Sequence, residues 1–136
     1  MSEANKALVH STYEAINSGN LDALDALMDD SFVEHEVLPG MPTGKEGVKA
    51  MFGMLRTAFP DLQMIPQQVI AESDFVSVFA TATGTHLGEF MGIPATNKFA
   101  SINLADFMLV RDGKVMEHWG VMDMASLMQQ LGAGAP

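Results

Sequence analysis

The sequence predicts an α+β domain in which helices cover one face of a curved antiparallel sheet. Apolar residues recur with helical spacing near the start of the chain and again at its end, and four segments between these regions alternate with a period of two. Helices, then a meander of strands, then a closing helix is the element order of an α+β fold. We expect the long strands to curl over an amphipathic helix into a cone that is open at one end, which would form a pocket.

The first two helices are expected over residues 3–18 and 20–28. An apolar stripe marks the first helix. Gly19 is expected to end it, because glycine readily adopts the left-handed backbone conformation that commonly follows the last turn of a helix. The side chain of Asn20 can cap the second helix.

The third helix, residues 44–59, has the clearest pattern. Thr43 and Glu46 have the spacing of a capping box, and Pro60 ends the segment. The apolar positions recur at i, i+3 and i+4, and they are Val48, Met51, Phe52, Leu55, Ala58 and Phe59. We expect this helix to pack inside the curled sheet, with Met51 or Leu55 near the cavity.

Strands and a closing helix are expected in the rest of the chain. The strands cover residues 62–72, 75–87, 99–110 and 114–122. Asp112-Gly113, between the last two strands, is a strong hairpin signal. The closing helix is indicated by Met124, Leu127, Met128 and Leu131.

The chain has 136 residues and a mass of 14.6 kDa, which fits one domain. We expect residues 1–131 to form this domain and residues 132–136 to form a flexible tail. Apolar side chains occupy both alternating faces of residues 99–110, so the outer face of the sheet should be covered as well. We therefore expect a homodimer formed through that face.

Charge and hydropathy restrict the partners. The chain has 17 acidic and 7 basic residues and a formal net charge of −10, which repels phosphate backbones and anionic lipid headgroups. No stretch approaches the roughly 20 apolar residues of a membrane span. We expect no nucleic-acid partner and no membrane partner. The polar segment from Met1 to Lys6 is unlike a signal peptide, so a cytoplasmic location is expected.

Several chemistries lack their parts. The chain has no cysteine, which rules out disulfides, thiolate zinc sites and thiol nucleophiles. No histidine pair has the spacing of a helical zinc motif, and the nucleophile elbow, the dinucleotide-binding glycines and the P-loop are absent. We therefore expect no metal site and no cofactor. The 12 methionines suit an irregular core or a pocket for an apolar ligand, and core packing is the commoner role.

Asp123 is the first candidate for proton transfer. It continues the phase of Trp119 and Val121 in the last strand, so we expect it to point toward buried apolar side chains. A carboxyl group in such surroundings has a raised pKa, as a general base near neutral pH requires. The alternative is that Asp123 caps the closing helix, and the two roles can coexist.

The histidines are further candidates. His86 is in phase with the apolar positions of its strand, where an isolated histidine is more often a hydrogen-bonded core residue than a catalyst. His35 and Glu36 are neighbours and face opposite ways in an extended chain. His118 lies on the face opposite Trp119, which predicts a place on the outer surface or at a subunit contact. 

Asp106 follows Ile102 and Leu104 in phase on its strand. It is expected to be buried and hydrogen-bonded rather than reactive.

Several short segments carry a family resemblance. They are FVEH at residues 32–35 leading to Pro-Gly at 39–40, AFPDL at 58–62, GTHLGEFMGIP at 84–94, DGKV at 112–115, and EHW at 117–119 followed by Asp123. In these segments the chain resembles the SnoaL-like polyketide cyclase family, from about Ala7 to Gly132. The resemblance implies the nuclear transport factor 2-like fold, a cystatin-like α+β barrel in which a curved antiparallel or mixed sheet wraps around roughly three or four helices, and it implies a dimer.

The resemblance also implies a reaction. It is a cofactor-free ring closure by intramolecular aldol condensation of an aromatic polyketide ester, with the carboxylate that matches Asp123 as general acid and base. The chain departs from the family pattern, because Phe79 and Leu109 lie where many relatives carry arginine, and Asn97 replaces a usual glycine.

Two functions remain open from the sequence. The first is a cyclase, isomerase or lyase that uses Asp123 to move protons on a small hydrophobic carbonyl compound, with His35 or His86 donating a hydrogen bond to oxygen. The second is a binding protein of the same shape without catalysis. The side chains expected against the ligand are Trp119, Phe79, Leu109, Met51, Leu55, Phe59 and Met91.

Overall fold

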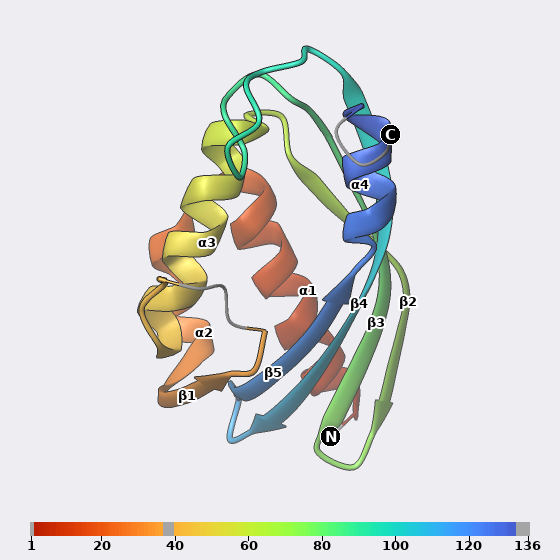
Figure 1. Ribbon diagram of the computed structural model, residues 1–136. Coiled ribbons are helices and arrows are strands. Elements are labelled where there is room, and N and C mark those ends of the chain that lie inside the picture. The colour runs from red at the N-terminus through yellow and green to blue at the C-terminus, as the bar shows by residue number, and fades with distance from the viewer. Residues whose placement is uncertain (1, 37–39, 133–136) are drawn as a thin grey trace.

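The computed structural model describes residues 2–36 and 40–132, so residues 133–136 of the predicted tail lie outside it. Figure 1 shows a curved sheet with helices against its inner face. The elements are α1 (Ser2–Ser18), η1 (Leu21–Ala23), α2 (Leu24–Leu27), β1 (Met28–Glu34), α3 (Gly44–Ala58), β2 (Gln63–Glu72), β3 (Phe75–Thr85), β4 (Phe99–Arg111), β5 (Lys114–Met122) and α4 (Met124–Gln130).

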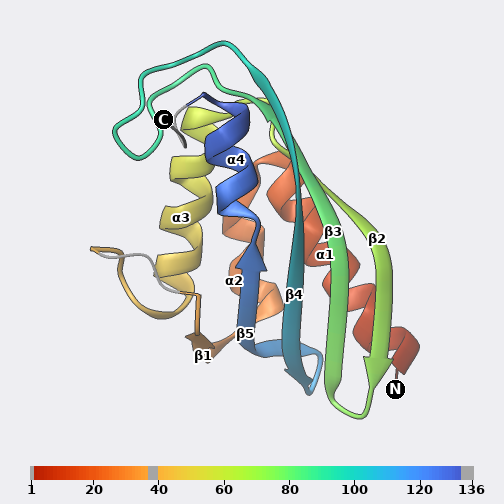
Figure 2. The ribbon, with the colours of Figure 1, turned by 45° about the vertical axis from the view of Figure 1, so that its right-hand side comes forward.

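The sheet has the strand order β1-β5-β4-β3-β2. β2 to β5 form an antiparallel meander, and β1 pairs in parallel with β5. The long strands β2, β3 and β4 bend together around the helices (Figure 2). The predicted fold class, an α+β cone with a mixed curved sheet, is therefore confirmed.

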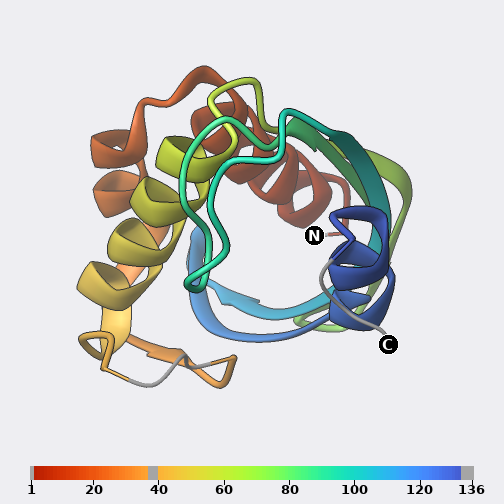
Figure 3. The same ribbon diagram turned by 45° about the horizontal axis from the view of Figure 1, so that its top comes forward.

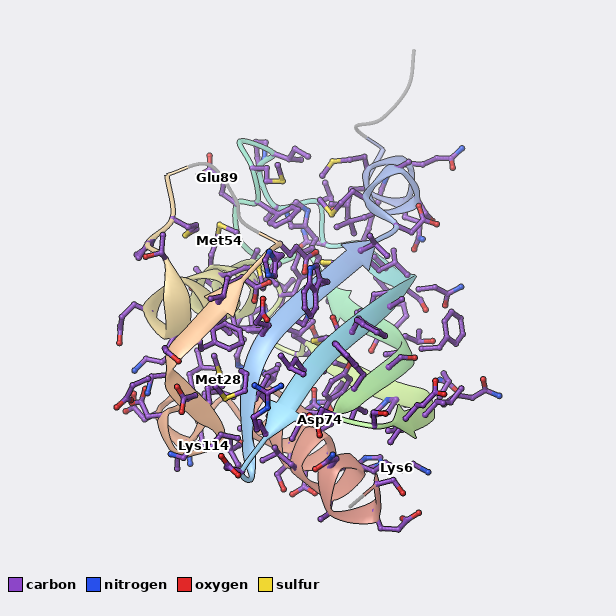
Figure 4. All side chains as sticks on the ribbon, turned by 90° about the horizontal axis from the view of Figure 1, so that it is seen from below. Lys6, Met28, Met54, Asp74, Glu89 and Lys114 are labelled. Carbon is purple, nitrogen blue, oxygen red and sulfur yellow. The ribbon has the colours of Figure 1, made fainter. Side chains whose placement is uncertain are left out.

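β1 is the element that the sequence analysis missed. Met28 was expected to end a helix, but α2 ends at Leu27 and Met28 opens the strand. Figure 4, seen from below, shows Met28 near Lys114, where β1 and β5 begin to pair. Only Met28 and Phe32 of this strand are buried, so the strand shows no alternation with a period of two.

α3 carries its apolar stripe into the interior. Its buried side chains include Val48, Met51, Phe52 and Leu55. They border one interior space together with Tyr13 of α1 and with inner-face side chains of the sheet. Viewed from the top, α1 and α3 lie on one side of the interior, and β3, β4 and β5 curve around the other (Figure 3). Thr43 is the residue before the helix, but its side chain makes no capping hydrogen bond.

A bulge in β5 decides which of its side chains face the interior. Val115 pairs with Val110 and Glu117 pairs with Leu109, so Met116 is an extra residue on β5. An extra residue reverses the alternation of the strand beyond it. Val115, before the bulge, and Trp119, beyond it, therefore lie on opposite faces of the sheet.

Beyond the bulge, the cross-strand partners show the new phase. His118 pairs with buried Met108, whereas Trp119 pairs with Phe107, which is 43% exposed. Side chains of directly opposite residues lie on the same face of a sheet. His118 and Gly120 therefore belong to the inner face, and Trp119 and Val121 belong to the outer face.

No helix in the described part of the chain is long and apolar enough to cross a membrane.

Two glycines of α3 should respond oppositely to a methyl group. A Cβ atom at Gly47 would overlap the carbonyl oxygen of Pro42, whereas a Cβ atom at Gly53 would meet open space. We expect Gly47→Ala to lower the free energy of unfolding by about 1–3 kcal/mol, because the loop before the helix must move. Gly53→Ala should raise it by about 0.5–1 kcal/mol, because alanine is the better helix former. Urea denaturation measures both, and a shift of the same sign in the two variants would contradict this packing.

Candidate active site

The interior of the cone contains a cavity of about 100 Å³. Apolar side chains from the helices and from the inner face of the sheet form most of its wall, for example Phe32, Met51, Leu55, Phe59, Ile102 and Met122. Five polar side chains of acid or base character enter it, and they are Tyr13, Glu34, Glu36, Asp106 and His118. The bulge in β5 places His118 in this group.

Four of the five form one chain of hydrogen bonds around His118. Its Nδ1 lies 2.6 Å from Oε2 of Glu34, and its Nε2 lies 2.7 Å from Oδ1 of Asp106. The hydroxyl group of Tyr13 donates to Oδ2 of Asp106. We name Tyr13, Asp106, His118 and Glu34 the imidazole cluster. It connects α1, β4, β5 and β1 through side chains alone.

His118 is the cationic member of this cluster. Burial alone would lower the pKa of His118, but the hydrogen bonds and negative charges of Asp106 and Glu34 outweigh it and raise that pKa to about 10. The ring therefore donates from both nitrogens at neutral pH. Burial raises the pKa of Tyr13, and the charge of Asp106 and the hydrogen bond to it add to the rise, so the phenol stays protonated.

Glu36 lies beside the cluster in a different electrostatic state. Burial raises the pKa of Glu36 to about 7, the charge of His118 opposes the rise, and the charges of Asp106 and Glu34 add to it. Its backbone N–H donates to Oε2 of Glu34 over 2.9 Å. A carboxyl group with such a pKa is present in both protonation states near neutral pH, as a general acid and base must be.

Glu34, Glu36 and His118 lie close enough together to hold a metal ion, since one ligand atom of each falls within 4.8 Å of the others. Both nitrogens of His118, however, are within 2.7 Å of a carboxylate oxygen. A metal ion on Nδ1 would have to replace the proton that Glu34 binds. The arrangement fits an ion-pair network better than a metal centre.

Asp123 lies outside this site. Its side chain is exposed, and its Oδ1 accepts a hydrogen bond of 3.0 Å from the backbone N–H of Ser126 at the start of α4. The expectation of a buried Asp123 is wrong because the bulge turns its phase outward. The alternative considered from the sequence, a helix cap, is what the structure contains.

Three other expected ligand contacts face the outside of the sheet. Phe79 is 47% exposed, and Leu109 and Trp119 share the outer face with it. Trp119 stacks on His35 at 4.6 Å between ring centroids, and Nε2 of His35 lies 2.8 Å from Glu117. None of these side chains lines the interior cavity. Phe79, Trp119 and His35 line a second hollow on the outer face, and contact of these side chains with a ligand stays a prediction. 

His86 and Met91 lie near the loop after β3. His86 is fully buried, with Nδ1 2.9 Å from the hydroxyl of Thr96, and its ring stacks on Phe59. It does not line the cavity, and its Nε2 has no hydrogen-bond partner among the described residues. Met91 is 60% exposed. Of the expected contacts, Met51, Leu55 and Phe59 lie on the cavity wall, and their contact with a ligand stays a prediction.

The site is not evident from the sequence for a local reason. A regular alternation along β5 predicts His118 on the outer surface or at a subunit contact, and the bulge reverses this. Glu34 and Glu36 do not stand out in the sequence because β1 lacks an alternating pattern. The available signal was their spacing, since two acids at i and i+2 in an extended chain point to the same side.

The fold and the site define an α+β protein with an apolar interior cavity that carries acid and base groups on one wall. The chain belongs to the SnoaL-like polyketide cyclase family, whose model matches residues 6–131. Membership supports a cofactor-free, cyclase-type role on small-molecule substrates.

Three relatives illustrate the similarity. Nogalonic acid methyl ester cyclase from Streptomyces nogalater is 26% identical over 120 residues, which cover 87% of this chain and 90% of the relative. The structure of TsrD from Streptomyces laurentii matches with a TM-score of 0.87 at 28% identity, over 96% of both chains. That of IdmH from Streptomyces antibioticus matches with a TM-score of 0.84 at 32% identity, over 94% of this chain and 98% of IdmH.

The raised pKa of His118 predicts a dependence of stability on pH. The folded state holds this proton more tightly than the unfolded chain, where the pKa is 6.5. The resulting stabilisation is complete below that value and is lost as the pH rises through about 10. NMR of the imidazole should show both nitrogens protonated at about pH 8, well above the ordinary titration range of histidine.

Substitution of His118 should remove the stabilisation that its protonated ring provides. His118→Leu leaves two buried carboxylates without a cation, so we expect the free energy of unfolding to fall by about 3–5 kcal/mol at neutral pH. His10→Leu, on the exposed side of α1, is the matched control and should change little. Equal stability of the two variants would mean that the cluster does not hold a charged imidazole.

Proposed function

We propose that the chain is a polyketide cyclase-type enzyme that performs cofactor-free acid and base chemistry on a small hydrophobic carbonyl compound. The observation that carries this proposal is the carboxyl and imidazole groups on one wall of an otherwise apolar cavity. A carboxylate in such a cavity is poorly solvated, which favours its taking a proton from a weakly acidic C–H group.

The reaction proposed is an intramolecular aldol condensation that stops at the addition step, so no water is lost. A carboxylate of the site removes a proton from the carbon next to a carbonyl, and the electron pair moves onto the oxygen as an enolate. The enolate carbon then forms a bond to a second carbonyl carbon of the same molecule. The resulting alkoxide takes the proton back from the carboxylic acid, so no oxidant, reductant or cofactor is consumed.

The substrate proposed is an aromatic polyketide ester, as the name of the Streptomyces nogalater relative suggests. The only positively charged side chain on the described wall is His118, and its charge is already balanced by two carboxylates. An ester brings no further negative charge to these carboxylates, whereas a free acid would.

Nogalonic acid methyl ester is the probe for this function. Intramolecular ring closure leaves the mass unchanged, so the product is followed by retention time and absorbance, and proton removal is followed by deuterium uptake in D₂O. We expect ring closure and deuterium uptake with the wild-type chain. Binding without either reaction would favour the alternative, a non-catalytic binding protein for an apolar molecule.

Two methionine variants test the place of binding. Met51 lies on the cavity wall and Met91 lies exposed on a loop. Met51→Ala should weaken the affinity for the same ester by roughly tenfold, because about two methylene-sized groups of contact are lost. Met91→Ala should leave it unchanged. Isothermal titration calorimetry measures both, and equal effects would place the ligand outside the cavity.

We also propose that the outer face of the sheet joins two copies of the chain. This face exposes Ile70, Phe75, Phe79, Phe107 and Val121, and Val121 alone is 69% exposed. Two copies of a chain with a net charge of −10 repel each other, so a contact between them is most favourable where the surface is uncharged. The middle of this face carries no charged side chain from β3 or β4. Apolar patches of this kind are typical of self-complementary interfaces.

Light scattering tests the dimer. The wild-type chain should give twice the mass of 14.6 kDa at micromolar concentration. Phe79→Glu should give the single-chain mass, because it places a charge at the centre of the contact. Leu87→Glu, an exposed leucine on the loop after β3, is the control and should remain dimeric. A wild-type mass of one chain would overturn this proposal.

A further inference from the structure

We infer that Glu36 is the side chain that exchanges the proton with the ligand, and that Gly120 keeps open the place in which its carboxyl group lies. This inference rests on the proposed function and names the residue that performs its chemistry.

The first argument is the fit between Glu36 and Gly120. A Cβ atom built at Gly120 would lie 2.5 Å from Oε1 of Glu36, 2.8 Å from Cε1 of His118 and 3.1 Å from Oδ1 of Asp106. Distances under 3.0 Å are closer than Cβ atoms approach other groups, so any side chain at this position would displace the carboxyl group. The inner face of β5 therefore has no side chain at Gly120, where the carboxyl group of Glu36 lies against it.

The second argument is the hydrogen bonding of the three carboxyl groups in the cavity. Oε2 of Glu34 accepts from His118 and from the backbone N–H of Glu36. Both oxygens of Asp106 are occupied, one by His118 and the other by Tyr13. The side chain of Glu36 has no hydrogen bond to any described residue, and it lines the cavity. It is the carboxyl group that can take up a proton without breaking the imidazole cluster.

The third argument is electrostatic and supports the geometry. The pKa of Glu36 is raised to about 7, so the group passes between its two states at neutral pH. Protonation of Asp106 or Glu34 would instead remove a charge that holds His118 as a cation. These two carboxylates position the site, and Glu36 changes state within it.

Asp123 is the competing residue, because the family resemblance assigns the acid and base role to it. It is exposed, lies beyond the outward-facing Val121, and already accepts a hydrogen bond from the backbone at the start of α4. To reach the ligand it would have to leave that cap. Glu36, which follows β1, thus lies against the inner face of β5 at Gly120, whereas Asp123 follows β5 and continues its outer face.

Glu36→Gln tests the inference with nogalonic acid methyl ester in D₂O. The amide keeps the shape of the carboxyl group but cannot accept the proton, so we expect deuterium uptake and ring closure to fall by about 10²–10⁴-fold with little change in affinity. The pH dependence of the rate near 7 should disappear with it. Glu36→Asp should keep part of the rate. Glu14→Gln, on the exposed side of α1, is the matched control and should behave as wild type.

Gly120→Ala tests the second part. The added methyl group should displace the carboxyl group of Glu36 and lower turnover at least tenfold, whereas the affinity for the ester, measured by calorimetry, should change much less. The melting temperature separates this effect from unfolding.

Distinct results distinguish the failure of the inference from the failure of the proposed function. A wild-type chain that turns over, with Glu36→Gln unaffected and Asp123→Asn or Asp106→Asn inactive, would overturn the role of Glu36 alone. A wild-type chain that binds the ester without proton exchange would overturn both. Loss of turnover with EDTA and its recovery with Zn²⁺ would overturn the role of Glu36 as well, because Glu36 and His118 would then be metal ligands.

Discussion

The imidazolium of His118, held between Glu34 and Asp106, is the interaction on which the arrangement of the site depends. It joins β1 to β5 by side chains, within the parallel pairing of these two strands. Two buried carboxylates so close together would repel each other strongly without the cation between them. The same ring therefore attaches the edge strand β1 to β5 and stabilises the acidic groups that face an apolar cavity.

The fixed charges of the cluster also determine what the neighbouring carboxyl group can do. Glu36 receives two opposing influences, because the carboxylates of Glu34 and Asp106 raise its pKa and the cation of His118 lowers it. Burial exceeds both and decides the direction. A group in this position is poised near neutral pH by its surroundings rather than by one partner, which is typical of acid and base residues in enzymes.

The general architecture could be predicted from the sequence, but the identity of the polar side chains that line the cavity could not. The stripe of α3 and the alternation of β3 and β4 depend on many residues, so they survive local irregularities. The orientation of His118 depends on one extra residue, Met116, which leaves no mark in composition or spacing. A prediction that assumes regular alternation along β5 therefore puts Trp119 and Asp123 on the inner face, whereas both belong to the outer face.

The bulge also explains how one strand serves two surfaces. Without the extra residue, the alternation would turn Trp119 and Val121 toward the inner face and His118 toward the outer face. With it, β5 presents the imidazole of His118 to the cavity, turns Gly120 toward Glu36, and presents an indole and a valine to the outer face. An insertion of one residue thus moves the polar chemistry inside and the apolar surface outside. Any substitution that removes the bulge would alter the cavity and the outer face of the sheet at the same time.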